Sequence, residues 1–398
     1  MSDGRDEDES GTAVDDVLER SDAPLAAVVE KLRTETAIES LRAEGVYDDS
    51  RRVREARGRS GAKPSDRANG SKTREDGPGR VALPVTEPPT ETAVLEVVRQ
   101  VDPEPRTRDL EDLLAERGWS DAALESAPGS WAVIGSVVLV RVPEDCPDER
   151  ALAEALLELH GDAASVLADE GIANDGEAGT YREPRTRLLA GESDTETIHT
   201  EHGTRYGLDP ATVMFSPGNQ AERARMGDLV AADERVFDMF AGIGYFTLPM
   251  ARTGARVTAT ELNPTAFRYL LENAVLNDVG DRVDAYMTDC RELASDLSVD
   301  RVVMGYYGRS DGRDADRGTG TRTDEAHEFL DDALEALDPG GVVHYHEATP
   351  ESRLWERPLE RLETAADAVG RDLEIRDRRR VKSHSAGVAH VVVDARFG

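Results

Sequence analysis

Apolar residues in the second half of the chain fall into short runs separated by stretches with helical spacing. Seven runs predict strands, at residues 235–240, 256–261, 282–287, 301–304, 341–345, 373–381 and 390–395. Helical spacing predicts helices at residues 245–252, 264–277, 323–337 and 351–369. This alternation is typical of a doubly wound, mostly parallel sheet covered by helices. We therefore expect an α/β, Rossmann-like domain with a seven-stranded sheet at residues 207–398.

The last two predicted strands are joined by the segment KSHSAGVA. A crossover between parallel strands needs about a dozen residues or more, so the pattern predicts an antiparallel pair. The sheet is therefore expected to be parallel except at this end.

The first 80 residues show a different pattern. An acidic leader of low apolar content predicts disorder. Residues 25–32 follow Pro24 with apolar side chains at helical spacing, which predicts a helix in a small N-terminal domain. The segment from Ser50 to Arg80 is rich in Arg, Gly and Ser and predicts a linker.

Residues 81–206 mix both kinds of pattern. Strands are predicted at residues 81–85 and across SWAVIGSVVLVRV, and helices at 108–117 and 149–160. This stretch is expected to form a small α+β domain.

Charge changes the picture of possible partners. The 398 residues carry 81 acidic and 48 basic side chains, a formal net charge of -33, and lysine is rare among the basic residues. This composition resembles that of proteins from a salt-saturated cytoplasm, as in haloarchaea, where charged surfaces keep a protein hydrated. Because the Debye length is only about 3 Å at 1 M salt, the negative charge does not exclude an RNA partner.

Other classes of protein are disfavoured. No apolar run approaches the roughly 20 residues needed to span a bilayer, and the acidic amino terminus is unlike a signal peptide. Cys146 and Cys290 are too few for a disulfide framework or a metal site. We expect a cytoplasmic protein without a metal, and favour a monomer.

The segment VFDMFAGIGYF predicts a ligand site where the first strand of the sheet ends. Gly242 would let the backbone approach a nucleoside beside Asp238, and Glu261 at the end of the second strand would bind ribose hydroxyls. Asp289 and the backbone of Cys290, after the third strand, suit an adenine ring. Each residue alone would equally serve as a turn former or helix cap, but together they indicate a nucleoside cofactor.

Two cofactor classes use this kind of sheet. Dinucleotide binding needs a third glycine for close helix packing, whereas this loop continues with Phe246 and Thr247. The antiparallel final pair is typical of S-adenosylmethionine transferases. We therefore predict S-adenosylmethionine as the cofactor.

The motifs DMFAGIGYFTLP and FSPGNQAERAR closely resemble an archaeal family of class I transferases that modify the tRNA purine 3′ of the anticodon. The family includes tRNA guanine-N1 methyltransferases and wybutosine-pathway aminocarboxypropyltransferases. The resemblance implies that Ser216 and Arg223 contact the methionine portion of the cofactor, Glu261 its ribose, and Asp289 with Cys290 its adenine. Independently, the guanidinium of Arg223 suits a carboxylate.

The fourth strand distinguishes the two reactions. N-methyltransferases usually carry Asn-Pro-Pro-Tyr there, whereas this chain has Met304-Gly305-Tyr306-Tyr307. Three further segments, GGVVHYHEATPE, WERPLERL and AGVAHVVVDARF, resemble the aminocarboxypropyltransferase branch. The resemblance implies transfer of the 3-amino-3-carboxypropyl group to 4-demethylwyosine in tRNA-Phe. The alternatives are a guanine-N1 methyltransferase at the same nucleotide and a noncatalytic RNA-binding protein.

No catalytic base is assigned from the sequence. Possible substrate contacts are Tyr306, His344, His346 and Glu347. The two histidines alternate on one strand and are better explained as a packed pair than as catalysts.

Three arginine groups could position tRNA through its phosphates. They are Arg51, Arg52, Arg54, Arg57 and Arg59; Arg182, Arg185 and Arg187; and Arg378, Arg379 and Arg380 with Lys382. Each group could instead pair with acids of the same protein. We favour the second group for docking the anticodon region, because the resemblance covers it.

Overall fold

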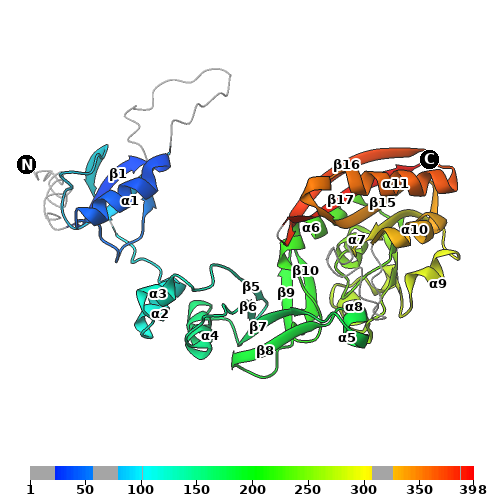
Figure 1. Cartoon of the computed structure of the whole chain (residues 1–398), viewed down its shortest axis with the longest axis horizontal. Coiled ribbons are helices and arrows are strands. Elements are labelled where there is room, and N and C mark those ends of the chain that lie inside the picture. Colours follow the sequence, from blue (N-terminus) through cyan, green and yellow to red (C-terminus); the bar gives the residue numbers. More distant parts are fainter. Residues whose placement is uncertain (1–22, 57–78, 101, 307–325, 386) are drawn as a thin grey trace, which may run out of the picture. The chain divides into compact units, whose positions relative to one another are not determined.

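The computed structural model describes residues 23–56, 79–100, 102–306, 326–385 and 387–398 (Figure 1). Two compact units divide the chain, at residues 1–109 and 110–398. The predicted leader, most of the predicted linker and Tyr307 lie outside the described residues. No helix among the described residues is long and apolar enough to cross a membrane.

The described residues of the first unit form a four-stranded antiparallel sheet in the order β2-β3-β1-β4 and one α-helix. Its elements are β1 (Leu25–Glu30), η2 (Lys31–Arg33), α1 (Thr34–Ala43), β2 (Arg54–Glu55), β3 (Arg80–Val85) and β4 (Glu96–Arg99). The prediction of a helix after Pro24 was wrong, because residues 25–30 form strand β1. Residues 26–29 are all buried in β1, which pairs with a strand on each side. A continuous buried run of this kind suits a central strand as well as a helix, and the pairing decides between them.

The boundary expected after residue 80 also needs correction. Strand β3 pairs with β1 along its whole length, from Arg80 opposite Glu30 to Val85 opposite Leu25. The strand therefore belongs to the first unit, and the division comes between Asp109 and Leu110.

The second unit begins with an α+β part that holds a sheet in the order β5-β6-β7-β8. Its elements are α2 (Leu110–Glu116), α3 (Asp121–Leu124), β5 (Trp131–Ile134), β6 (Val137–Val140), α4 (Glu149–Leu159), β7 (Ser165–Ile172), α5 (Gly176–Thr180) and β8 (Pro184–Gly191). The predicted strand SWAVIGSVVLVRV is a hairpin of β5 and β6, because Gly135 turns the chain with a φ of 55°.

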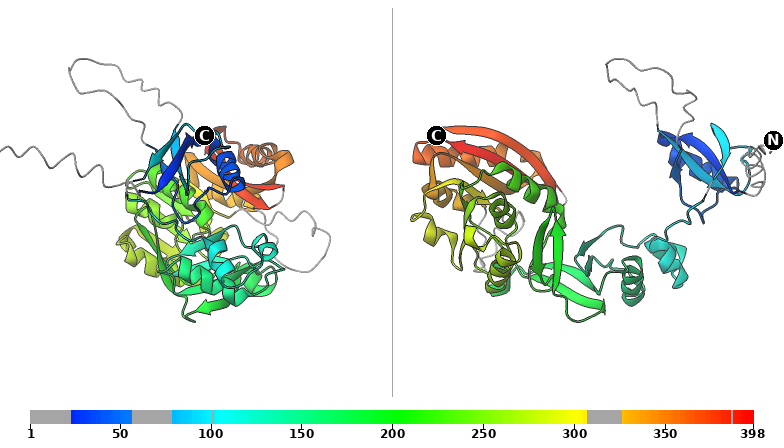
Figure 2. Two further views of the ribbon diagram at one scale, coloured as in Figure 1. Left: turned by 90° about the vertical axis from the view of Figure 1, so that its left-hand side faces the viewer. Right: turned by 180° about the vertical axis from the view of Figure 1, so that it is seen from behind.

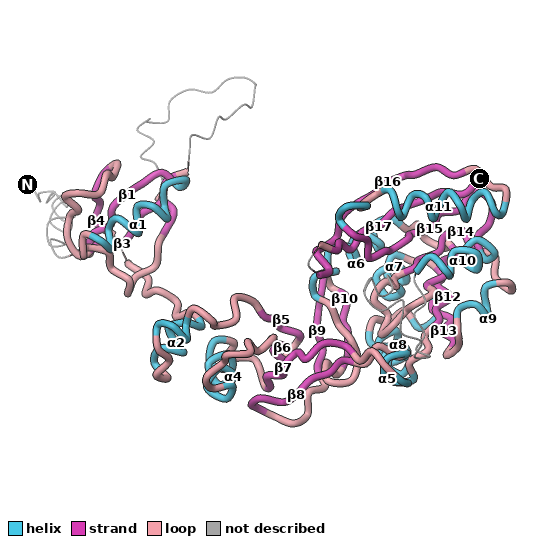
Figure 3. The backbone as a smooth tube through the Cα atoms, viewed as in Figure 1, coloured by secondary structure: helices cyan, strands magenta, loops and turns pink. Residues whose placement is uncertain are grey.

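A second hairpin, β9 (Thr197–Glu201) with β10 (Thr204–Leu208), leads into the main sheet (Figure 3). The boundary expected after residue 206 falls within β10. Short segments η3 (Pro217–Asn219) and α6 (Gln220–Leu229) follow.

The main sheet has seven strands in the order β13-β12-β11-β14-β15-β17-β16. They are β11 (Arg235–Asp238), β12 (Arg256–Thr260), β13 (Val283–Tyr286), β14 (Val299–Met304), β15 (Leu337–Pro350), β16 (Leu373–Ser385) and β17 (Val388–Phe397). The first five run parallel, and β17 is antiparallel to both neighbours. The predicted seven-stranded α/β sheet and its antiparallel final pair are confirmed.

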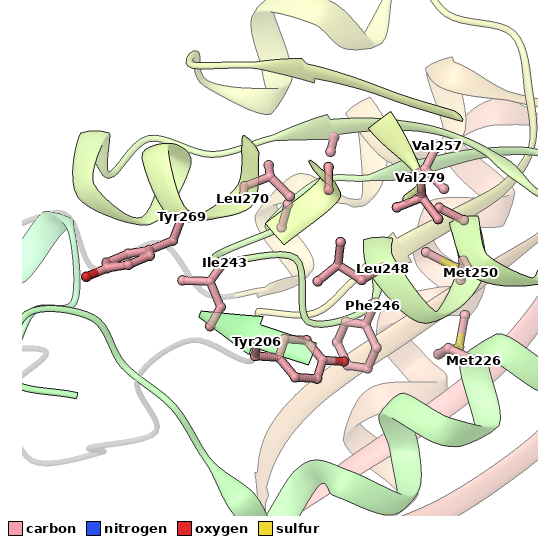
Figure 4. Packing of buried hydrophobic residues seen from close by; sticks show 14 of the residues in the cluster. Tyr206, Met226, Ile243, Phe246, Leu248, Met250, Val257, Tyr269, Leu270 and Val279 are labelled. Atoms are coloured by element: carbon pink, nitrogen blue, oxygen red, sulfur yellow. The ribbon is translucent and has the colours of Figure 1, made fainter. Parts of the chain in front are cut away.

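Helices cover both faces of this sheet, as the views in Figures 1 and 2 show. They are α7 (Thr247–Thr253), α8 (Pro264–Leu276), α9 (Cys290–Ala294), α10 (Leu330–Ala336) and α11 (Glu356–Val369), with η4 (Gly280–Arg282), η5 (Ala326–Phe329) and η6 (Glu351–Arg353). Consecutive residues of β11 belong to different hydrophobic cores, one on each face of the sheet. Val236 packs with α6, α7 and α8, whereas Phe237 packs with α9, α10 and α11. Figure 4 shows the first of these cores, with Leu248 and Leu270 at its centre.

Asp238 ends β11 inside the protein, with no exposed surface. Its Oδ2 accepts a hydrogen bond of 2.7 Å from the hydroxyl of Thr247, at the start of α7. Burial raises the pKa of Asp238 to about 6. Asp238 therefore joins the strand to the helix at an electrostatic cost when it is ionised.

Asp238→Asn should change the pH dependence of stability. A carboxyl with a raised pKa stabilises the fold below about pH 4, and this contribution is lost as the pH rises through about 6. The free energy of unfolding of the variant, relative to wild type, should rise by about 3 kcal/mol over that interval. Urea unfolding in high salt from pH 4 to 7 measures the difference. Parallel profiles for the two proteins would contradict the assignment.

Candidate functional site

A cavity opens where β11, β12 and β13 end. Its lining includes Ser216, Arg223, Gly242, Glu261, Asp289 and Cys290, which are six of the seven residues predicted to bind the cofactor. Because the carboxyl ends of parallel strands share one edge of a sheet, residues far apart in sequence meet here. The seventh predicted residue, Asp238, does not line the cavity, which corrects the expectation that it binds the cofactor. It contacts Thr247 instead.

Glu261 joins two strand ends at the centre of the site. Its Oε2 accepts a hydrogen bond from the Gly242 amide at 2.8 Å, and its Oε1 accepts one from the Asn263 amide at 2.7 Å. Burial raises the pKa of Glu261 above its ordinary value. A ribose hydroxyl could donate to the remaining lone pairs of this carboxylate.

Gly242 is required at its position. Its φ is 58°, and a Cβ atom there would lie 2.3 Å from the ring of Tyr245. Glycine accepts this left-handed conformation without strain, so the backbone can approach a ligand closely. The sequence motif is thus explained by both conformation and space.

Asp289 caps α9 by accepting a hydrogen bond from the Arg291 amide at 3.1 Å. The Arg291 guanidinium also binds it, with an Nη2 to Oδ2 distance of 2.7 Å. The neighbouring Cys290 is buried, and burial raises the pKa of its thiol far above the ordinary value. A neutral thiol of this kind is inert as a nucleophile, in keeping with the expected backbone role of Cys290.

Arg223 is already paired within the protein. Its guanidinium binds both carboxylate oxygens of Glu201 at 2.7 Å and donates to the Ser216 carbonyl at 3.0 Å. Both charged side chains are 3% exposed. Arg223 therefore reaches the cavity as one half of a buried ion pair, so its charge is balanced before any ligand binds.

An aromatic wall closes another side of the cavity. The ring of Tyr306 lies 5.2 Å from that of Phe240 and 6.3 Å from that of Phe329, and the Arg182 guanidinium lies 5.5 Å from the Tyr306 centroid. Planar groups of this kind can stack on a base extruded from RNA.

Several lining residues were missed by sequence reasoning. Tyr181 and Arg182 come from the loop after α5, and the Tyr181 carbonyl accepts a 3.4 Å hydrogen bond from the Asn263 side chain. Arg182 was expected only at a tRNA-docking surface. Asn219 lies within the motif FSPGNQAERAR, which was the available signal for it.

The other proposed substrate contacts lie away from the cavity lining. His344 Nδ1 is 2.7 Å from Asp394 Oδ1, and His346 Nδ1 is 3.1 Å from His390 Nε2. Burial lowers the pKa of His346 to about 3. Both histidines are packed groups, as expected. Glu347 is buried and pairs with arginines of α11.

Most described arginines of the three predicted docking groups have partners inside the protein. The first group contacts Asp48 and Glu104, the second Asp175 and Glu149, and the third Glu222 and Glu351. Arg57 and Arg59 lie outside the described residues. Among the described residues, no group of three or more His, Cys, Asp or Glu side chains is placed to hold a metal ion.

Two family models match the chain. Residues 197–375 match the TRM5/TYW2 methyltransferase domain, and residues 94–195 match the TYW2 N-terminal domain. The tRNA(Phe) (4-demethylwyosine(37)-C(7)) aminocarboxypropyltransferase of Pyrococcus horikoshii is 38% identical over 271 residues, which are 68% of this chain and 89% of that protein.

Solved structures of proteins with similar names also resemble this chain. TYW2 of P. horikoshii in complex with MeSAdo is 34% identical and has a TM-score of 0.58, covering 71% of this chain and 96% of that one. Trm5b of Pyrococcus abyssi is 28% identical with a TM-score of 0.64, covering 94% of this chain and 99% of that one. With this fold, this pocket and these relatives, the chain belongs to the TRM5/TYW2 family of class I methyltransferase-fold proteins.

Proposed function

We propose that this protein transfers the 3-amino-3-carboxypropyl group of S-adenosylmethionine to the 4-demethylwyosine base beside the anticodon of tRNA-Phe. The observation that carries the proposal is the cavity at the ends of β11, β12 and β13, in a chain 38% identical to an aminocarboxypropyltransferase. In the proposed complex, Glu261 binds the ribose, Asp289 and the Cys290 backbone bind adenine, and Ser216 and Arg223 border the methionine portion.

The proposed reaction depends on the alignment of the two substrates more than on a reactive side chain of the protein. The C7 carbon of the base attacks the γ-carbon of the methionine portion, and the bond from that carbon to sulfur breaks. The electron pair stays on sulfur, which leaves as neutral methylthioadenosine, and C7 then loses its proton to solvent. Because a sulfonium is a good leaving group, the protein contributes mainly by aligning the two carbons and excluding water.

The fourth strand favours this reaction over methyl transfer. Met304 is fully buried in the core, and Gly305 packs against Phe246, where a Cβ atom would lie 2.8 Å from the ring. Neither residue offers a side-chain amide to align a ring nitrogen. Tyr306 instead offers an aromatic face to the base.

The partner in this proposal is tRNA, and the proposed location is the cytoplasm. A solved Trm5–tRNALeu complex is 22% identical with a TM-score of 0.62, and it shares the fold. The net charge of -33 is compatible with RNA binding in a salt-rich archaeal cytoplasm, where screening is strong. We propose that the protein acts as a monomer.

The reaction can be identified with doubly labelled S-adenosylmethionine, carrying one isotope in the methyl group and another in the carboxypropyl chain. With tRNA-Phe containing 4-demethylwyosine, we expect the carboxypropyl label in tRNA and the methyl label in methylthioadenosine. The matched control is tRNA-Phe with an unmodified guanine. Transfer of the methyl label alone to either tRNA would contradict the proposal and favour the guanine-N1 methyltransferase.

Glu261→Ala should weaken binding of S-adenosylmethionine and methylthioadenosine alike, since both carry the ribose. Loss of a charged hydrogen-bond acceptor predicts a decrease of about 1 to 3 kcal/mol in binding free energy. Titration calorimetry in high salt measures both ligands. Glu261→Gln, which keeps the shape of the side chain and one acceptor oxygen, should lose less binding affinity than Glu261→Ala. An unchanged affinity in the alanine variant would refute the ribose contact.

A further inference from the structure

Lys382 is a half-buried cation beside the cavity. Its Nζ donates a 2.6 Å hydrogen bond to the hydroxyl of Ser216, which lines the cavity. Burial and the nearby Arg223 guanidinium lower the pKa of Lys382 below its ordinary value. Lysine is rare here, at four positions against 48 basic residues in total, so a lysine at this site stands out.

A bulge in β16 directs Lys382 to this place. Arg380 pairs with Val391 and Lys382 with His390, so the residue between them has no counterpart on β17. The alternation of side chains shifts by one, and Lys382 joins Arg379 on the face that packs against η3 and α6. Bulges often re-aim a side chain in this way beside a functional site.

The other cations along this face contact carboxylates. Arg225 lies 2.7 Å from Asp377, and Arg379 lies 2.8 Å from Asp394 and also binds Glu222. Arg223 has its own partner in Glu201. Lys382, in contrast, contacts a hydroxyl, and no ion pair involving it is found within the described residues. A desolvated ammonium beside a second cation is stabilised by an anion.

A second polar group lies next to Ser216, because the Asn219 backbone amide donates a 3.1 Å hydrogen bond to the Ser216 carbonyl. Asn219 lines the cavity, and the Asn219 Oδ1 atom is buried without a hydrogen-bond partner among the described residues. An unpaired buried acceptor costs free energy unless a ligand donates to it. The site thus presents cationic and hydroxyl donors at Lys382 and Ser216, and an acceptor at Asn219.

We propose that Lys382 and Ser216 bind the carboxylate of the cofactor's amino-acid end, while Asn219 accepts a hydrogen bond from its ammonium. A zwitterion matches this set of groups, and the Glu201-paired Arg223 contributes position more than net charge. Anchoring the amino acid at this end fixes the γ-carbon between the sulfur and the base. The inference rests on the proposed function and names the residues that orient the transferred group.

The test compares three ligands in high-salt calorimetry: S-adenosylmethionine, its decarboxylated analogue and methylthioadenosine. Lys382→Met should lower the affinity for S-adenosylmethionine roughly tenfold to a hundredfold, as expected for loss of a charged hydrogen bond. Methylthioadenosine has no amino acid, so its affinity should stay the same and also shows that the variant is folded. The preference of the wild type for S-adenosylmethionine over the decarboxylated analogue should disappear, and Lys382→Arg should restore part of it.

The matched control is Arg380→Met. Arg380 is the neighbouring cation on β16 and contacts Glu351 at 2.6 Å, so its loss should leave the affinities for all three ligands unchanged. Asn219→Ala should weaken the binding of S-adenosylmethionine and of its decarboxylated analogue equally, because both ligands carry the ammonium group.

Two outcomes would overturn the inference. An unchanged S-adenosylmethionine affinity in Lys382→Met, with weaker tRNA binding, would assign Lys382 to an RNA phosphate. An equal loss for methylthioadenosine would show a general structural defect. A wild-type protein that binds none of the three ligands would instead refute the proposed function itself.

Discussion

The carboxylate of Glu261 is the contact on which the site depends. It bridges the amide of Gly242, in the loop after β11, and the amide of Asn263, at the start of α8. The bond from Gly242 links the loop after the first strand to the end of the second strand, the bond from Asn263 orients the carboxylate, and all three residues line the cavity. The bridge is possible because parallel strands end at the same edge, and because Gly242 adopts a left-handed conformation without strain.

Two buried charged groups near Glu261 are controlled by their surroundings. Asp238 is buried at the end of β11 and has a raised pKa, and the charge of Arg223 is balanced by Glu201 within the core. A buried ion pair of this kind adds specificity of position more than stability. It holds the Ser216 carbonyl and the α6 helix in register, so that the hydroxyl of Ser216 can meet Lys382. Helix α6 and the hairpin β9–β10 therefore orient the part of the cavity at which we propose that the amino-acid end of the cofactor binds.

The family uses one sheet for two reactions, and the side chains around the cavity separate them. A methyl and a carboxypropyl carbon are attached to the same sulfur, so selection depends on which carbon lies in line with the base. In this chain the fourth strand ends at Met304 and is followed by Gly305 and Tyr306, with aromatic packing where an amide side chain would stand in a base N-methyltransferase. The choice between reactions is thus a matter of shape and orientation.

The sequence alone determined the seven-stranded α/β sheet, its antiparallel end and six of the residues around the cavity. The sheet and its antiparallel end depend on local patterns, namely apolar periodicity and a loop too short for a crossover. Gly242, Glu261, Asp289 and Cys290 were found from their positions after successive strands, whereas Ser216 and Arg223 were implied by the resemblance of the motif FSPGNQAERAR. Tertiary structure decided the rest. Pairing on both sides makes residues 25–30 a strand, and burial against Thr247 takes Asp238 out of the cavity lining. A bulge turns the side chain of Lys382 toward Ser216. Such contacts join residues distant in sequence, and no local pattern encodes which side chains will meet.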